Sequence, residues 1–274
     1  MISKLGILID LVSTALFVFF VSTTIVNDKI DFIEVDKVSN KVNENSMYAD
    51  IINYANKPTL EIRNRMTCAH ETTHMINAEL RNKVRSVRLN DKLRMDGRHI
   101  NAFYLPAGWG FVVEEPNIRK IQVADFIPPS VRGYRYNTYI TGAREWDKQP
   151  LYIVDEWCAY INGALVGIDD VNTERYRDGW TDGVSGCLEF SLYGVALCMA
   201  IEKYDNKYWN ENERFRAFMK WNLKRAFNTY EIGKDYKEFK WNKQEEFLQR
   251  FRTSEETKAI RDFMMKHFDG VGLK

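Results

Sequence analysis

The chain has 274 residues, a length that suits one large domain or two small ones and favours a single core. Hydrophobic residues make up 45% and charged residues 28%, which excludes a disordered, a collagen-like and a multi-span membrane protein. The 39 Lys and Arg residues against 38 Asp and Glu residues give a net charge of +1. Since the basic surplus typical of nucleic-acid-binding proteins is missing, we expect no nucleic-acid partner.

The N-terminal region holds one long apolar run, Leu5–Val26, which follows Lys4 and precedes a polar segment. A cationic start, an apolar centre and a small-residue end outline a signal peptide, although no Ala-x-Ala cleavage pattern is present. At about 20 residues the run is also long enough for an uncleaved membrane anchor, in which Asp10 would be costly. We predict that residues 1–26 export the chain or anchor it to a membrane, which makes it extracytoplasmic; the alternative is a buried helix.

Four cysteines follow this run, at positions 68, 158, 187 and 198. In an exported chain they permit one or two disulfides, and ordinary buried thiols are the alternative. No Cys-x-x-Cys pair occurs, which disfavours a thiolate zinc site.

The next segment, residues 27–57, is polar and rich in Asn, and it predicts a tether to a single domain over residues 58–274. A helix is predicted from Thr59, as its N-cap, to about Asn82. Apolar and small residues recur there at alternating spacings of four and three, which predicts one buried helix face. These residues are Ile62, Met66, Ala69, Thr73, Ile76 and Leu80.

The middle of the domain has strand-like patterns. Residues 103–105 and 111–113 flank a loop with Gly and Pro and predict two strands; residues 121–127 and 134–140 predict two more. Helices are predicted over about 156–167 and 188–204, and the C-terminal part, about 188–274, is predicted to be helical around aromatic anchors. The predicted class is therefore α+β, mostly helical, with a small sheet between two helices that carry functional residues.

The chemistry-bearing motif is His70-Glu71-Thr72-Thr73-His74. On a helix, positions i and i+4 lie one above the other, so both imidazoles project from one face and can share a metal ion. Zinc suits this ligand set, and Glu71 is placed to take a proton from zinc-bound water as that water attacks a carbonyl. We expect one Zn²⁺ per chain.

Through His70, Glu71 and His74 the chain resembles the zincin metallopeptidases. Their metzincin branch has a Gly three residues after the second His and a third His six residues after it. Asn77 and Leu80 stand at these positions, which excludes that branch. The gluzincin branch takes its third ligand from a Glu on a later helix, often within a Glu-x-x-Ala pattern.

The resemblance implies that Glu156, which is followed by Ala159, is this third ligand. Both residues share a helical face with Gly163 and Gly167, and such small residues would let this helix approach the His70/His74 helix closely. Other candidates for the third ligand remain: His99, Asp155, Glu145 and His267.

Gluzincins often stabilise the oxyanion with a Tyr, His or Arg across from the metal. Tyr152 and Tyr160 lie four residues before and after Glu156, and are the first candidates for this catalytic role. The alternatives are Arg135, Tyr136 and Tyr139. A peptide or protein substrate would add as a strand to an exposed edge at Phe111–Glu114.

These patterns predict an exported or membrane-anchored zinc metallopeptidase that hydrolyses peptide bonds. A cell-wall peptide amidase would share the same chemistry. The alternative from another class is a non-catalytic binding or scaffold protein at the membrane, with a structural or idle metal site. Glu71 separates the classes, because a purely structural site has no use for a free carboxylate beside the metal.

Overall fold

The computed structural model describes residues 30–90 and 99–274, so the predicted export segment Leu5–Val26 lies outside the described residues. In the described residues the protein is mostly helical with one three-stranded antiparallel sheet, in the order β1-β3-β2. The predicted α+β class is therefore confirmed. The helices and strands are β1 (Ile33–Glu34), α2 (Met47–Ile52), α3 (Arg65–Asn90), β2 (Ile100–Leu105), β3 (Trp109–Glu114), α4 (Tyr152–Asn172), α5 (Gly183–Tyr204), α6 (Asn206–Glu211), α7 (Glu213–Gly233), α8 (Gln244–Thr253) and α9 (Lys258–Phe268).

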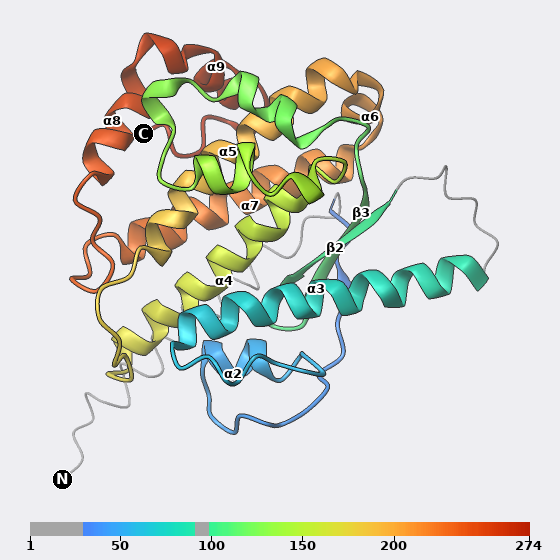
Figure 1. The fold of residues 1–274 in the computed structure, drawn as a ribbon, viewed down its shortest axis with the longest axis vertical. Coiled ribbons are helices and arrows are strands. Elements are labelled where there is room, and N and C mark those ends of the chain that lie inside the picture. Colours follow the sequence, from blue (N-terminus) through green and yellow to red (C-terminus); the bar gives the residue numbers. More distant parts are fainter. Residues whose placement is uncertain (1–29, 91–98) are drawn as a thin grey trace.

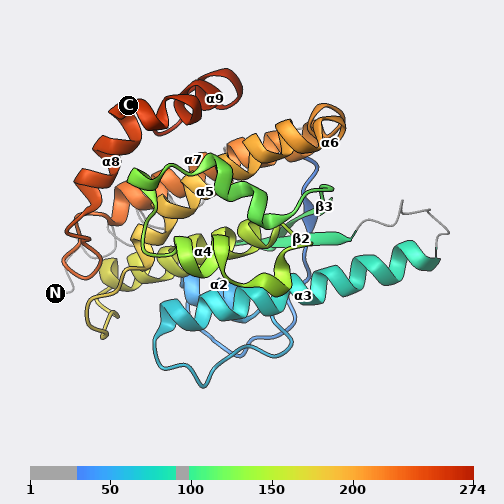
Figure 2. The same ribbon diagram turned by 45° about the horizontal axis from the view of Figure 1, so that its top comes forward.

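The long helices pack in sequence order across the domain. Helices α3 and α4 lie side by side, and strand β2 packs against both (Figure 1). Helix α5 packs on α4, and α7 packs on α4 and α5. Figure 2 shows α8 and α9 on the side of α5 and α7 that faces away from α3. The α3–α4 pair therefore stands at one side of the helical core.

The segment predicted to be a tether is instead part of the domain where the structure describes it, over residues 30–57. Ser46 caps α2 by accepting a hydrogen bond from the Ala49 amide at 3.1 Å. Ile51 and Ile52 of α2 are fully buried, and α2 packs on α3. Strand β1 pairs with β3, with Ile33 opposite Gly110. Helix α2 was not predicted, because its few apolar residues at helical spacing lie within a polar stretch.

Helix α3 has the predicted buried face but different ends. It begins at Arg65, where the Asn64 side chain accepts the Thr67 amide at 2.8 Å, and it runs on to Asn90. Thr59 does not cap this helix; its hydroxyl donates to the Cys68 carbonyl. The helical members of the predicted face are all buried: Met66, Ala69, Thr73, Ile76 and Leu80.

Two of the four predicted strands are confirmed as β2 and β3, which pair with Phe103 opposite Phe111. The strand predicted over residues 121–127 is wrong, because Lys120–Phe126 forms a 3₁₀ helix (η1). Val123 and Ile127 are the buried residues of this segment, at helical rather than alternating spacing, while Ile121 is 38% exposed.

The strand predicted over residues 134–140 is also wrong, because Tyr136–Thr141 forms a π-helical turn (η3). Its buried residues, Tyr136 and Ile140, are again four apart. The buried Lys120 ammonium donates to the carbonyls of Tyr139, Ile140 and Gly142 at 2.7–2.9 Å. A tertiary hydrogen-bonding partner therefore holds this turn, which local alternation did not indicate.

Strand β3 is not the exposed edge predicted for strand addition, since it lies between β1 and β2. Beyond the short pairing with β1, the side of β3 that faces away from β2 is covered by helices. Arg214 donates to the Val112 carbonyl at 3.2 Å, and the Tyr208 hydroxyl donates to the Glu114 carbonyl at 2.8 Å. The site predicted at Phe111–Glu114 for an added peptide strand is therefore wrong.

The four cysteines are free thiols, all buried, which matches the second of the two predicted alternatives. Two of them, Cys187 and Cys198, belong to α5. Among residues 30–90 and 99–274, α5 is the one helix that is long and apolar enough to cross a membrane, but 94% of its apolar window is buried inside the protein. It serves as the central core helix.

Candidate metal centre

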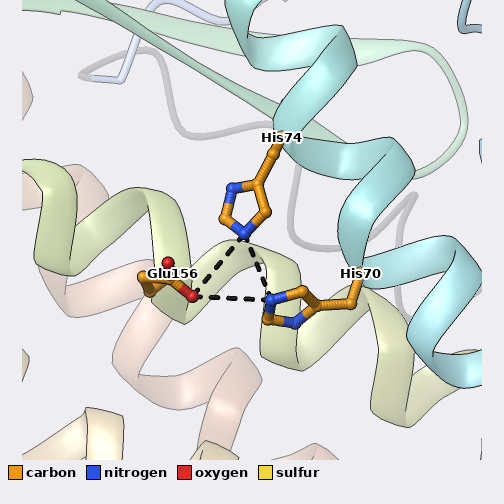
Figure 3. A group of neighbouring side chains, drawn as sticks. All are labelled: His70, His74 and Glu156. Carbon is orange, nitrogen blue, oxygen red and sulfur yellow. Dashed lines mark hydrogen bonds and ion pairs between the residues drawn. The ribbon is translucent and has the colours of Figure 1, made fainter. Parts of the chain in front are cut away.

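The three predicted metal ligands meet between α3 and α4 (Figure 3). The Nε2 atoms of His70 and His74 are 3.1 Å apart. Glu156 Oε2 lies 3.5 Å from His70 Nε2 and 3.6 Å from His74 Nε2. One imidazole nitrogen from each His and one carboxylate oxygen therefore face one point.

Close packing of α3 and α4 brings these ligands together, and the small residues of α4 permit it. A Cβ atom at Gly163 would lie 2.9 Å from the Met66 carbonyl oxygen, and one at Gly167 would lie 2.3 Å from the Met66 sulfur. Larger side chains here would push the helices apart. The spacing of these glycines from Glu156 is the feature that predicted this contact.

The spacing of the three atoms suits a metal ion. With zinc–ligand bonds of about 2.0–2.1 Å, adjacent ligands of a tetrahedral site lie about 3.3 Å apart, and the three observed distances bracket that value. Glu156 Oε2 is buried, and among the described residues it has no hydrogen-bonding partner. At 3.5–3.6 Å the imidazole nitrogens are too far away for good hydrogen bonds. A buried acceptor left without a partner is costly, and a bound cation would satisfy it.

Asp155 is not a member of this group but supports it from behind. Its Oδ1 lies 2.5 Å from His74 Nδ1, the ring nitrogen that faces away from the group. Arg81 donates to Asp155 Oδ2 at 2.7 Å, and Asn77 donates to Oδ1 at 3.0 Å. A carboxylate behind a ligating imidazole fixes its tautomer and orientation. Asn77 and Arg81 thus continue the polar face of α3 past His74.

Asn77 also ties this support to the sheet, because its side-chain oxygen accepts the backbone amide of Tyr104 in β2 at 2.6 Å. Asn162, which the sequence did not single out, makes a second tie. It donates to the Thr73 hydroxyl of α3 and to the Tyr104 carbonyl, and it accepts from Arg225 of α7. A buried Asn on an otherwise apolar helix face was the available signal.

The charges at this site reinforce one another. Burial acts to lower the pKa of His74, but the hydrogen bond to Asp155 and the negative charges of Asp155 and Glu156 outweigh it and raise this pKa to about 10. Burial acts to raise the pKa of Glu156, but the two imidazoles outweigh it and lower this pKa to about 2. The site therefore carries a strong preference for positive charge between the helices.

Glu71 follows His70 on α3 and its side chain is partly exposed. No hydrogen bond or ion pair from another described residue engages its carboxylate, in contrast to Asp155. It therefore remains available to a water molecule or a substrate.

Of the tyrosines predicted beside the site, Tyr160, Tyr139 and Tyr152 lie near the candidate ligands, and Tyr136 does not. The Tyr160 ring packs edge-on against the His70 imidazole, with centroids 4.7 Å apart, and its hydroxyl lies 3.1 Å from that of Tyr139. Burial and the nearby Glu156 carboxylate raise the pKa of Tyr152. Tyr136 is buried and packs against Arg132 rather than against the ligands.

Arg135 lies against Tyr160 rather than at the candidate ligands. Its guanidinium lies 4.7 Å from the centre of the Tyr160 ring, forms a buried ion pair with Glu189, and forms a second ion pair with the partly exposed Asp182. It supports the wall beside His70 and is itself only 2% exposed.

The remaining candidates for the third ligand lie outside the group of His70, His74 and Glu156. His99 is exposed just before β2, and Glu145 is exposed in the turn before α4. His267 of α9 pairs with Glu202 at 3.1 Å and packs against Trp209. Helix α9 lies on the far side of the domain (Figure 2).

Comparison with known proteins adds no relative to this description: no family model, no curated protein and no solved structure matches the chain.

Proposed function

We propose that the protein is a zinc-dependent metallopeptidase, held outside the cytoplasm or at a membrane by residues 1–26. One observation carries the catalytic part of the proposal. His70, His74 and the unpartnered Oε2 of Glu156 face one point, and the unengaged carboxylate of Glu71 follows the first of these ligands. The donor set of two imidazoles and one carboxylate is that of catalytic zinc sites that keep a position open.

The chain's own residues would divide the work of hydrolysis. Zinc, when bound by His70, His74 and Glu156, supplies Lewis acidity to the substrate carbonyl and to the attacking water. Glu71 accepts the proton that this water loses as its oxygen bonds to the carbonyl carbon. The C–N bond then breaks, and the same proton passes from Glu71 to the leaving amine, so that the carboxylate is regenerated.

Tyr160 and Tyr152 are the candidate donors to the carbonyl oxygen as it gains negative charge. Tyr160 contacts His70, and Tyr152 lies close enough to Glu156 for that carboxylate to raise the pKa of its phenol. Both hydroxyls would have to reach the reacting group in the substrate complex. Asp155 would hold His74 in the orientation that directs Nε2 towards the metal.

Glu71→Gln tests the proposal, because Gln keeps the volume of the side chain but cannot accept the proton. On a mixture of internally quenched peptides, the zinc-loaded variant should lose about 10²–10⁴-fold in rate while its zinc content and melting temperature stay as in the wild type. Glu79→Gln, a partly exposed position two turns further along α3, is the matched control and should keep full activity. Full activity of Glu71→Gln would rule out this mechanism, and selective cleavage of cell-wall peptides would favour the amidase.

A further inference from the structure

A row of aromatic side chains leads away from the candidate metal centre. From His70 it passes to Tyr160, Tyr139, Tyr152 and Trp146, with successive ring centroids 4.7, 6.1, 6.3 and 5.2 Å apart. We call these four aromatic residues the aromatic row. They come from three separate segments: α4, the turn η3, and the turn at Arg144–Trp146 just before α4.

The aromatic row differs from the aromatic packing of the core. The core stack of Phe103, Phe111 and Phe218 is fully buried. Each member of the aromatic row is only partly buried, although the four rings form a continuous series. Trp146 and Tyr152 stack almost parallel, with 2° between their planes, at the end furthest from His70. Partly exposed, contiguous aromatic surface next to a reactive centre is typical of a ligand-binding surface.

Buried cations hold the row in place. Lys120 fixes the turn that carries Tyr139 through three backbone carbonyls, and Arg135 lies over the Tyr160 ring. The fully buried Phe190 packs against Tyr139 and Tyr160, and the part of the four rings that remains exposed is aromatic surface with phenolic hydroxyls. Such a surface favours a flat apolar group, through offset or edge-on ring contacts, over a charged or small one.

We propose that the aromatic row is the subsite for a peptide side chain next to the bond that is cut, and that it selects aromatic side chains. This inference rests on the proposed function. The row begins at the candidate ligand His70, and its Tyr152 lies close to the candidate ligand Glu156. A peptide held at the metal centre would therefore place a neighbouring side chain against part of the row.

Two small hydroxamates test the subsite separately from turnover. A hydroxamate group chelates zinc, so phenylalanine hydroxamate and alanine hydroxamate share the anchor and differ only in the side chain. With the zinc-loaded full chain, the phenylalanine compound should bind about tenfold more tightly. Trp146→Ala should bring the two affinities to within about threefold of each other, and Trp146→Phe should restore most of the difference.

Trp180→Ala is the matched control, because Trp180 is 59% exposed and makes no ring contact with the row. It should leave the tenfold difference unchanged, and the melting temperature of each variant checks the fold. Equal binding of both hydroxamates, or a preference that Trp146→Ala leaves intact, would overturn the subsite while the metallopeptidase survives. If neither hydroxamate binds to the zinc-treated chain, the metal centre fails and the subsite with it.

Discussion

Two buried carboxylates of this protein, Glu156 and Glu189, differ in how completely other groups of the protein pair with them. Glu189 is 1% exposed and fully paired: Oε1 accepts from the Arg135 guanidinium at 2.8 Å, and Oε2 accepts from the Arg135 amide and the Tyr193 hydroxyl. Glu156 is 7% exposed, yet its Oε2 has no hydrogen-bonding partner in the described residues and faces two imidazole nitrogens.

The difference separates a structural charge from a candidate functional one. A buried carboxylate needs an opposite charge and hydrogen bonds to offset the cost of leaving water. The protein supplies both to Glu189 from its own side chains. Around Glu156 the facing groups are the imidazoles of His70 and His74, at 3.5–3.6 Å from Oε2, at the point where the three candidate ligand atoms converge. Substitutions at the two clusters should therefore affect different properties: stability at Glu189 and metal binding at Glu156.

The largest expected effect on stability is at the structural cluster. Glu189→Gln leaves the 2%-exposed Arg135 without its main counter-charge, and should lower the free energy of unfolding by about 3 kcal/mol without changing zinc stoichiometry. Chemical denaturation measures the change. Glu246→Gln, which breaks an exposed ion pair with Arg250, is the control and should cost less than about 1 kcal/mol. If Glu189→Gln left the free energy of unfolding unchanged, the contrast between the two clusters would be removed.

The next effect concerns Asp155, which contacts His74 from behind. Asp155→Asn should weaken zinc binding by about 10–100-fold, because it removes the carboxylate that orients the imidazole but leaves all three ligands in place. Competition with a zinc chelator of known affinity measures the change. His99→Ala should leave the affinity unaltered. If Asp155→Asn abolished binding as completely as His74→Ala, Asp155 would have to be a ligand after all.

A smaller effect concerns pH. Because the pKa of His74 is raised to about 10 in the metal-free protein, zinc must displace one proton, and its affinity should rise about tenfold per pH unit between pH 7 and 9. The stability of the metal-free protein should instead fall as the pH rises. The raised pKa stabilises the fold below about pH 6.5, and this contribution is lost as the pH rises towards 10.

Titrations with zinc and melting curves with a chelator, both over pH 6–10, measure the two trends. Glu156 adds a separate dependence of stability at acidic pH. Its lowered pKa stabilises the fold above about pH 4.5, and this contribution is lost as the pH falls towards 2. A zinc affinity that does not change with pH would show that His74 releases no proton on binding.

The parts of the fold predicted from the sequence were those with a strong local period. The buried face of α3 and the strand pair β2–β3 followed from spacing and alternation. The turn η3 could not be predicted this way, because the Lys120 ammonium, distant in sequence, holds its carbonyls. The short α2 was missed because its few apolar residues lie within a polar stretch, where burial depends on α3 being present.

For the site, the resemblance to zincins and the spacing of the residues named the candidates but did not assign every role. The resemblance named Glu156 as the third candidate ligand, and the small residues Gly163 and Gly167 on its helix do allow α4 to approach α3. The role of Asp155 could not be predicted, because neighbouring residues on a helix point about 100° apart and only the packing decides which one faces the ligands. Trp146 and Asn162 gave no motif, and their significance comes from contacts across elements.

Zinc stoichiometry in two matched variants tests the central claim most directly. The wild-type chain and Glu189→Gln, purified, stripped of metal and dialysed against zinc, should each retain about one zinc ion per chain. Glu156→Gln, with the same change at the other buried carboxylate, should retain far less, and His70→Ala and His74→Ala should retain none. Full zinc occupancy in Glu156→Gln and His74→Ala would contradict the assignment of this site as a metal centre.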